Sequence, residues 1–262
     1  MKLAIAGKGG VGKTTLASLL AGVYSAQGQQ VIAIDADPDA NLAAALGIPI
    51  DQASQITPIA QMEELITERT GAKPGSTTTY FKLNPKVDDI PDRFSATKDN
   101  IRLLRMGEVK AGGGGCVCPE STLLKALMSH LLLGRRDVVI MDMEAGLEHL
   151  ARGTARAVDA FIIVVEPGQR SLQTAKAVRK LAVDLGIEKC YVVGCKVNGD
   201  DDRKYIKDNL PDFEMLGFID YNPEIAEADR NGVAAFEYVP EAAAQAKEIV
   251  NKLDQIWRTG GG

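Results

Sequence analysis

The sequence contains no long hydrophobic run and no excess of positive charge. No stretch of about 18 consecutive apolar residues occurs, so we expect no membrane-spanning helix. Lys and Arg total 30 against 35 Asp and Glu, and the net charge of −5 gives no electrostatic footprint for nucleic acid or anionic lipid. The N-terminal residues form a strand-like apolar run, so we expect no signal peptide. We therefore expect a cytoplasmic protein that binds neither nucleic acid nor membrane.

Cysteine and histidine are scarce, with four Cys and two His in 262 residues. In a reducing compartment, so few cysteines are better suited to be thiols or metal ligands than disulfides. The chain is long enough to bury the core of one compact domain.

A glycine-rich octet near the N-terminus, Gly-Lys-Gly-Gly-Val-Gly-Lys-Thr, predicts a nucleoside triphosphate site. In such a P-loop, backbone N–H groups cradle the phosphates, Lys13 reaches the β- and γ-phosphates, and the Thr14 hydroxyl binds Mg²⁺. The apolar run at 2–6 predicts a strand before the loop, and 14–27 predicts a helix after it, whose N-terminus favours anions. A glycine-rich turn without a ligand is the weaker alternative in this context. The predicted nucleotide-binding residues of this segment are Gly7, Lys8, Gly9, Gly10, Val11, Gly12, Lys13, Thr14 and Thr15.

Short apolar runs recur along the chain with helical patterns between them. They lie at residues 31–34, 101–106, 138–141, 161–165, 191–193 and 215–219. This alternation is typical of βαβ units, and runs that are apolar throughout indicate strands buried on both faces. We predict an α/β fold: a single-domain P-loop NTPase with a mostly parallel sheet and helices on both faces. Ligands bind such sheets at the carboxyl ends of the strands.

The predicted domain spans residues 1–258, with residues 259–262 as a tail. Between about 74 and 100, several prolines interrupt the periodicity, which indicates an insertion loop. A linker between two domains is the alternative. Strands of the same pattern follow the segment, and this favours one domain.

Two aspartates follow the second predicted strand, and their position suits catalysis. Phosphoryl transfer to water needs a group that orients the attacking water and acceptors around the Mg²⁺ hydration sphere. We assign Asp37 to both tasks, with Asp39 as the second candidate for the water. The alternative role is capping of the short helix expected at 42–46.

A further aspartate, Asp142, ends the apolar run at 138–141. This is the expected position of a Walker B carboxylate near Mg²⁺. Gly146, a few residues on, lets its backbone approach the γ-phosphate and respond to its loss, as switch segments do.

Three segments, Gly7–Thr15 with Lys8, Asp35–Pro38 and Asp142–Gly146, together resemble the deviant-Walker ATPases, which include the nitrogenase iron protein, MinD and ParA. The resemblance covers nearly the whole chain. It implies Mg²⁺-dependent hydrolysis of ATP to ADP and phosphate. It also implies a homodimer that forms on ATP, in which Lys8 crosses to the partner's phosphates like an arginine finger.

A Cys-x-Cys motif lies in the segment 112–119, after four consecutive glycines. Cys116 and Cys118 can converge on one soft metal ion, while Pro119 suits the first position of a helix through residue 133. Two thiolates leave two positions of a tetrahedral ion empty, and a two-fold dimer would fill them with its second pair. Such a four-sulfur site suits Ni²⁺ or Zn²⁺. Two incidental buried thiols are the alternative.

With this motif, residues 84–88, 105–108 and 148–155 resemble the CooC group of nickel-insertion ATPases for carbon monoxide dehydrogenase. The resemblance implies a nickel metalloenzyme as client. Related accessory proteins serve acetyl-CoA synthase, and nothing in the sequence separates the two clients. Many relatives carry Asn-Lys where this chain has Cys195-Lys196. Because cysteine does not replace the hydrogen bonds of asparagine to adenine, Asn198 becomes the candidate for that contact.

The leading hypothesis is an ATPase whose hydrolysis couples dimer closure to the holding and release of Ni²⁺ for a metalloenzyme. One alternative is a MinD/ParA-like positioning ATPase, which needs a basic amphipathic tail or a basic patch. The helical pattern at 242–257 carries mixed charges instead. The other alternative is an iron-sulfur carrier, although such carriers in this family more often show Cys-x-x-Cys.

Overall fold

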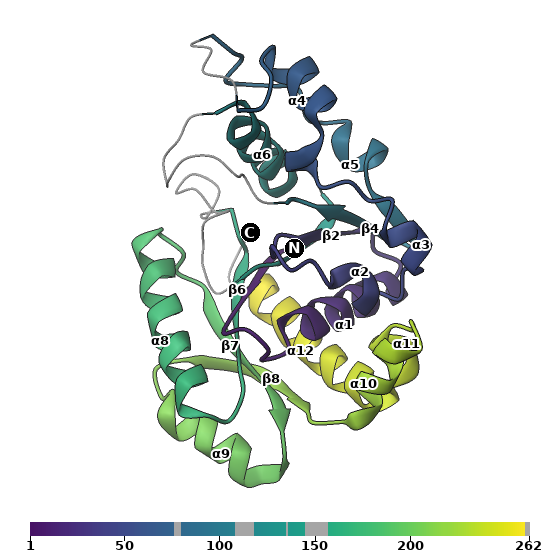
Figure 1. Cartoon of the computed structure of the whole chain (residues 1–262). Coiled ribbons are helices and arrows are strands. Elements are labelled where there is room, and N and C mark those ends of the chain that lie inside the picture. The colour runs from purple at the N-terminus through teal and green to yellow at the C-terminus, as the bar shows by residue number, and fades with distance from the viewer. Residues whose placement is uncertain (76–79, 108–117, 135, 145–156, 260–262) are drawn as a thin grey trace.

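The computed structural model describes residues 1–75, 80–107, 118–134, 136–144 and 157–259 (Figure 1). Cys116 and Gly146 lie outside the described residues, as do residues 112–117 of the Cys-x-Cys segment.

Within the described residues, eight strands form one sheet in the order β3-β4-β2-β5-β1-β6-β7-β8. All neighbouring strands are parallel except β3 and β4, which are antiparallel. The strands are β1 (Lys2–Ala6), β2 (Val31–Asp35), β3 (Ala96–Lys98), β4 (Ile101–Arg105), β5 (Val138–Asp142), β6 (Ala160–Val165), β7 (Cys190–Val197) and β8 (Glu214–Asp220).

Every apolar run identified in the sequence forms a strand of this sheet. The four strands β1, β2, β5 and β6 are buried at every position, because helices cover both of their faces. The predicted α/β fold with a mostly parallel sheet is therefore confirmed. No helix among the described residues is long and apolar enough to cross a bilayer.

The helices connect successive strands and pack on the two faces of the sheet. They are α1 (Lys13–Ala26), α2 (Leu42–Ala45), α3 (Ile50–Ala53), α4 (Glu63–Thr70), α5 (Ile90–Arg93), α6 (Pro119–Ser129), α8 (Gln169–Asp184), α9 (Gly199–Asn209), α10 (Pro223–Arg230), α11 (Ala235–Tyr238) and α12 (Pro240–Thr259). A 3-10 turn covers Ile59–Gln61, and a π-helical turn at His130–Gly134 continues α6.

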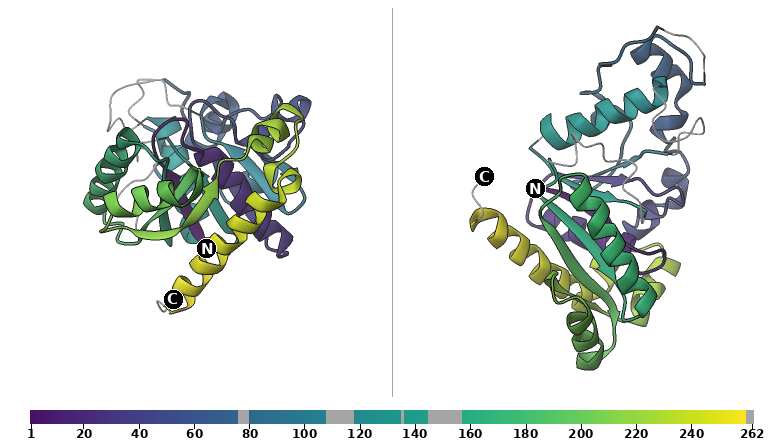
Figure 2. Two further views of the ribbon diagram at one scale, coloured as in Figure 1. Left: turned by 90° about the horizontal axis from the view of Figure 1, so that it is seen from below. Right: turned by 90° about the vertical axis from the view of Figure 1, so that its left-hand side faces the viewer.

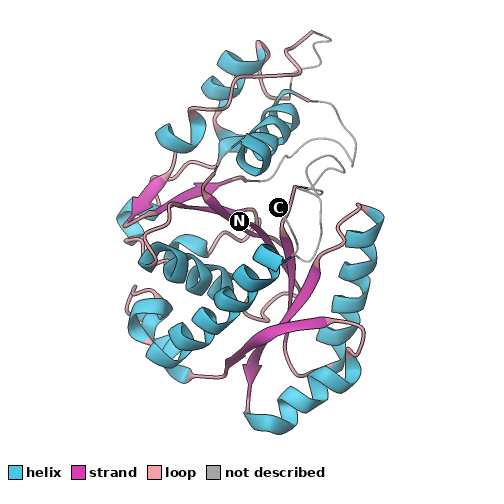
Figure 3. Cartoon of the chain, turned by 180° about the vertical axis from the view of Figure 1, so that it is seen from behind, coloured by secondary structure: helices cyan, strands magenta, loops and turns pink. Residues whose placement is uncertain are grey.

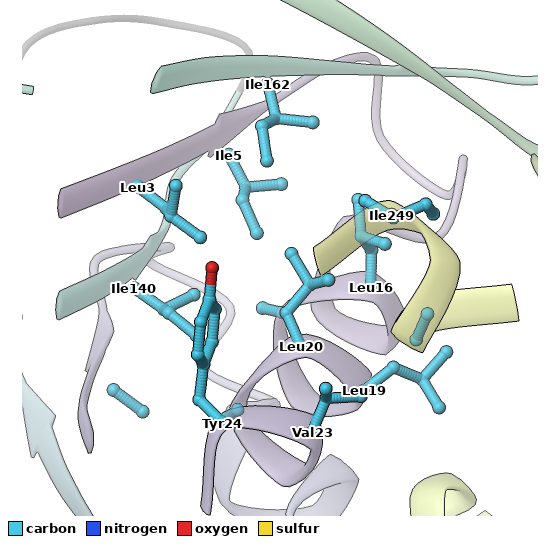
Figure 4. Close-up of a cluster of buried hydrophobic side chains, with 14 of the residues drawn as sticks. Leu3, Ile5, Leu16, Leu19, Leu20, Val23, Tyr24, Ile140, Ile162 and Ile249 are labelled. Carbon is cyan, nitrogen blue, oxygen red and sulfur yellow. The ribbon is translucent and has the colours of Figure 1, made fainter. Parts of the chain in front are cut away.

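Two hydrophobic cores lie on opposite faces of the sheet. Buried side chains of α4, α6, α8 and α9 form one core, and those of α1, α2, α11 and α12 form the other. Figures 2 and 3 show α12 and the pair α8 and α9 on opposite sides of the strands. In the second core, the α1 residues Leu16, Leu20 and Tyr24 point toward β1, β5 and β6 (Figure 4). This packing fixes the start of α1 against the end of β1.

The predicted insertion at 74–100 has no helix or strand among its described residues before Ile90. It then forms α5 and the edge strand β3, neither of which was predicted from the sequence pattern. Both elements are short, and β3 is paired only with β4 in the described sheet. The excursion therefore extends the same sheet.

Candidate functional site

The glycine-rich loop joins β1 to α1 at the centre of the sheet. Gly7 has φ 154° in this structure, and a Cβ atom there would lie 2.5 Å from the carbonyl oxygen of Val164 on β6. Gly12 has φ 104°, a conformation that side-chain-bearing residues rarely adopt. The loop thus needs glycine both for close approach to β6 and for its backbone turn.

The loop delivers the N-terminus of α1 to the carboxyl edge of the sheet. Gly12 caps the helix and has no side chain that could accept a hydrogen bond from the first N–H groups. These free donors and the helix dipole make an anion site. Lys13, the first residue of α1, has a side chain that is almost fully buried beside this site.

Asp142 ends β5 directly beside the loop. The Thr14 hydroxyl donates a hydrogen bond to its carboxylate, and Oδ1 is buried without a hydrogen-bond partner in the described part of the chain. Burial raises the pKa of Asp142 to about 6, against the lowering effects of Thr14 and the Lys13 ammonium. A buried carboxylate oxygen without a partner, next to a threonine hydroxyl, suits a divalent cation or its water shell.

Asp35, at the end of β2, is a second buried carboxylate, and no function was predicted for it from the sequence. It is in register with Asp142 on the neighbouring strand. Its Oδ2 accepts the backbone N–H of Leu42 at 3.0 Å, while its buried Oδ1 has no partner among the described residues. Burial is the main cause that raises the pKa of Asp35 to about 7, and nearby Asp142 adds to the shift. Asp35 follows an apolar run as Asp142 does, so the signal that identified Asp142 was available for Asp35 as well.

A cavity of about 540 Å³ opens at the start of α1 and brings several predicted residues together. Asp37 and Asp39 both line it, and Asp37 Oδ1 accepts the N–H of Asp39 at 3.0 Å. Capping of α2 does not occupy either side chain, because Asp35 accepts the Leu42 N–H instead. The described lining residues are Gly9, Gly10, Gly12, Lys13, Thr14, Thr15, Asp37, Asp39, Asn41, Glu144 and Lys196.

Three of these lining residues, Asn41, Glu144 and Lys196, were not predicted as site residues. The available signal for Glu144 was its place two positions after Asp142, inside the segment Asp142–Gly146 that resembles the deviant-Walker ATPases. The available signal for Lys196 was its place in the Cys195-Lys196 pair, where many relatives carry Asn-Lys, but its direction depends on an irregularity in β7 that the sequence does not reveal.

A second cavity of about 310 Å³ shares Thr14, Thr15 and Asn41 with the first and extends to α10 and α11. Asn198 lines neither of these two cavities; it caps α9, and its N–H donates to Asp202 Oδ2 at 2.7 Å. Its assignment to adenine remains a prediction.

Lys8 lies at the surface of the loop, where its Nζ is 3.5 Å from Glu166 Oε1 at the end of β6. Both side chains are partly exposed. The lysine that is implied to act on a second chain is thus paired within its own chain.

Cys118 is buried and lies directly before α6. Pro119 is the first residue of that helix, as predicted. Glu120 follows with its side chain buried; its Oε1 accepts the N–H of Gly75, and its Oε2 has no partner in the described residues. Among the described residues, no three His, Cys, Asp or Glu side chains form a group that could hold a metal ion. The predicted thiolate site includes Cys116, which is outside that part of the chain.

The other two cysteines occupy β7. The Cys195 side chain packs under the loop at Gly12, and complete burial raises the pKa of its thiol to about 12. Burial also raises the pKa of the Cys190 thiol. Both cysteines are free thiols that suit packing better than metal binding.

Comparisons with known proteins agree with this geometry. The family model described as CobQ/CobB/MinD/ParA nucleotide binding domain matches residues 2–235. The carbon monoxide dehydrogenase accessory protein CooC of Rhodospirillum rubrum is 46% identical over 253 residues, which cover 97% of this chain and 96% of that protein. An uncharacterized ATP-binding protein of Methanocaldococcus jannaschii is 44% identical over 99% of this chain and 100% of its own length.

Among solved structures, the MinD cell division protein of Aquifex aeolicus aligns with a TM-score of 0.66 and 21% identity, over 97% of this chain and 98% of that one. This likeness concerns the fold. Together with the phosphate loop at the start of α1 and the nearly full-length match to CooC, it shows that the chain belongs to the CobQ/CobB/MinD/ParA nucleotide-binding family, as an ATPase of the CooC type.

Proposed function

We propose that this ATPase is a nickel-insertion metallochaperone, in which the nucleotide controls how a homodimer holds one Ni²⁺ cargo ion for a client such as carbon monoxide dehydrogenase. The observation that carries the proposal is the identity to the carbon monoxide dehydrogenase accessory protein CooC over nearly all of both chains, in a sequence with Cys116 and Cys118. Zn²⁺ is the alternative ion, and acetyl-CoA synthase the alternative client.

The nucleotide half of the mechanism follows from the described residues. The N–H groups at the start of α1 and the Lys13 ammonium bind the phosphates. Thr14 and Asp142 would hold Mg²⁺, directly or through water, and the ion would neutralise charge on the phosphates. Asp37, on the wall of the same cavity, orients the attacking water, and Asp39 is the second candidate. Lys8 reaches the phosphates of the partner chain once it leaves Glu166.

Backbone hydrogen bonds at the ends of β4, β2 and β5 connect the nucleotide site to the start of the segment that leads to the proposed metal ligands. The N–H of Met106, which follows β4, donates to the carbonyl oxygen of Asp35 at 2.9 Å, and the N–H of Ala36 donates to that of Asp142 at 3.0 Å. The segment that carries the thiols continues from β4. Through these hydrogen bonds, a movement of residues 35–39 on hydrolysis would reach the end of β4, from which the chain continues to the Cys-x-Cys segment.

The surroundings of Cys118 suit a cation bound by thiolates. The residue begins a helix whose dipole favours negative charge at that end, and the buried carboxylate of Glu120 keeps one oxygen without a described partner two residues later. Two such segments in a homodimer would offer four sulfurs to one ion.

Elemental analysis combined with light scattering tests this proposal. The parent protein should bind one Ni²⁺ or Zn²⁺ per two chains, and the metal should drive dimerisation by mass action. Cys116→Ala and Cys118→Ala should each lose both effects, whereas Cys190→Ala, a thiol on β7, should retain them. A double Cys116/Cys118 variant that still binds one tight metal per dimer refutes the site. Anaerobic reconstitution with iron and sulfide that yields a cluster spectrum would instead support an iron-sulfur carrier.

A further inference from the structure

Lys196 lies at the end of β7, directly opposite the glycine-rich loop. Its Nζ donates a hydrogen bond to the carbonyl oxygen of Gly10 at 2.5 Å, and the side chain lines the phosphate-side cavity. The preceding residue, Cys195, packs against Gly12. The end of β7 therefore supports the loop at two points, one apolar and one charged.

The backbone at Lys196 is strained. Its φ is +57°, and among the described non-glycine residues only Asp99 also has a positive φ. In this left-handed region the Cβ atom of an L-residue lies too close to the following carbonyl oxygen, a contact that glycine avoids. Such strain persists where the surrounding structure imposes it, and it is concentrated at functional sites.

A β-bulge causes this conformation. On β8, Ile219 and Asp220 are adjacent, but their partners on β7 are Cys195 and Val197, so Lys196 is the extra residue. In a regular strand, residues 195 and 197 would share a face. Here Cys195 belongs to the core beneath α1, and Val197 belongs to the core on the other face. The bulge removes Lys196 from both faces and directs it along the edge of the sheet to the loop.

The charge of Lys196 is needed in that cavity. Among its described lining residues, Asp37, Asp39 and Glu144 are acidic, and only Lys13 and Lys196 are basic. A polyphosphate entering this cavity meets three carboxylates. A second ammonium group offsets their repulsion, and its bond to the Gly10 carbonyl keeps that oxygen from turning toward the phosphates.

We propose that Lys196 is a positioning residue for nucleotide binding: the strained bulge at the end of β7 holds its ammonium group on the Gly10 carbonyl, which fixes the loop with its N–H groups toward the phosphates. The role concerns the ATPase site and does not depend on the nickel proposal. A residue with a purely structural role would change the stability of the fold and the affinity for nucleotide together. For Lys196 we expect the two to change separately.

The test compares Lys196→Ala with Lys196→Gly. Both remove the ammonium group, but only glycine relieves the left-handed strain. Both variants should bind Mg²⁺-ADP about tenfold more weakly than the parent in calorimetry, the effect of losing one charge-assisted hydrogen bond. In thermal melts without nucleotide, Lys196→Gly should unfold at a higher temperature than Lys196→Ala.

Asp99 provides the matched control, because it is also left-handed but lies in the exposed turn between β3 and β4. Asp99→Gly should likewise melt above Asp99→Ala, with the parental affinity for Mg²⁺-ADP in both. Parental affinity in both Lys196 variants would overturn the proposal. A loss of affinity in Lys196→Ala that Lys196→Gly restores would also overturn it, because the effect would then come from the backbone and not from the ammonium group.

Discussion

Lys8 Nζ lies 3.5 Å from Glu166 Oε1 of the same chain. The pair joins the glycine-rich loop after β1 to the end of β6, the neighbouring strand. In the proposed dimer Lys8 contacts the partner's phosphates, so this intrachain pair has to open when ATP brings two chains together. Glu166 then opposes dimerisation in the isolated chain.

Glu166→Gln should therefore favour the ATP-bound dimer. Each dimer opens two such pairs, and at about 0.3 kcal/mol for each partly exposed ion pair the dimer dissociation constant in the presence of a non-hydrolysable ATP analogue should fall about threefold. Sedimentation at several protein concentrations measures it. Glu248→Gln, which changes an exposed carboxylate on α12, serves as the charge control. An unchanged or higher dissociation constant in Glu166→Gln contradicts this role of Glu166.

The two lysines of the loop should differ in their effects. Lys13→Ala removes a buried charge from the phosphate site, and affinity for Mg²⁺-ATP should fall by about tenfold to a hundredfold. Lys8→Ala should bind ATP normally and lower the turnover by about a thousandfold, as the loss of a trans-acting arginine finger does. Titration calorimetry and phosphate release distinguish the two. A Lys8→Ala protein that hydrolyses ATP at the parental rate rules out the trans role.

The two cavity aspartates should also separate. Asp37→Ala should bind Mg²⁺-ATP yet hydrolyse it about a hundredfold more slowly, and it should accumulate the closed dimer. Asp39→Ala should have a milder effect, because the Asp39 side chain is exposed. The hydrogen bond that Asp39 donates to Asp37 comes from its backbone N–H, which alanine retains. Single-turnover kinetics provide the comparison. Severe loss in Asp39→Ala with little in Asp37→Ala would reverse the assignment.

The buried carboxyl groups predict how stability depends on pH. The pKa values of Asp35 and Asp142 rise to about 7 and about 6 in the folded chain, from an ordinary value of 3.8. Between pH 4 and 7 the native state then holds protons that the unfolded state has released, so the free energy of unfolding falls as pH increases. For each unit by which a pKa is higher in the folded chain than in the unfolded chain, the free energy of unfolding falls by about 1.4 kcal/mol as the pH passes from below both pKa values to above them.

Asp35→Asn should reduce this slope in urea titrations carried out in EDTA without nucleotide. Asp51→Asn, at an exposed position of α3, is the control and should retain it. Mg²⁺ with ADP should lessen the loss of stability toward neutral pH in the parent, because the ion favours ionised carboxylates. A parent protein whose stability rises steadily from pH 4 to 7 in EDTA would contradict the buried pair.

The strands and the phosphate loop were predictable because each is a local pattern. Every apolar run became a strand, and the loop appeared where strand and helix meet. The short edge strand β3 has no such pattern and exists through its pairing with β4. Asp35, Glu166 and Lys196 acquire their roles from contacts with distant residues, or from a bulge that changes the register by one position. Sequence periodicity carries no information on such distant contacts or on the position of a bulge.

The most direct test measures Ni²⁺ affinity by equilibrium dialysis in two nucleotide states, with Mg²⁺-ADP and with a non-hydrolysable ATP analogue. If the nucleotide controls the metal, the two dissociation constants should differ by about fivefold or more, and Ni²⁺ should change the ratio of the affinities for the analogue and for Mg²⁺-ADP by the same factor. Cys118→Ala should abolish both effects, and Cys190→Ala should preserve them. Equal Ni²⁺ affinity in the two states, with the cysteine site intact, would contradict a nickel-insertion ATPase.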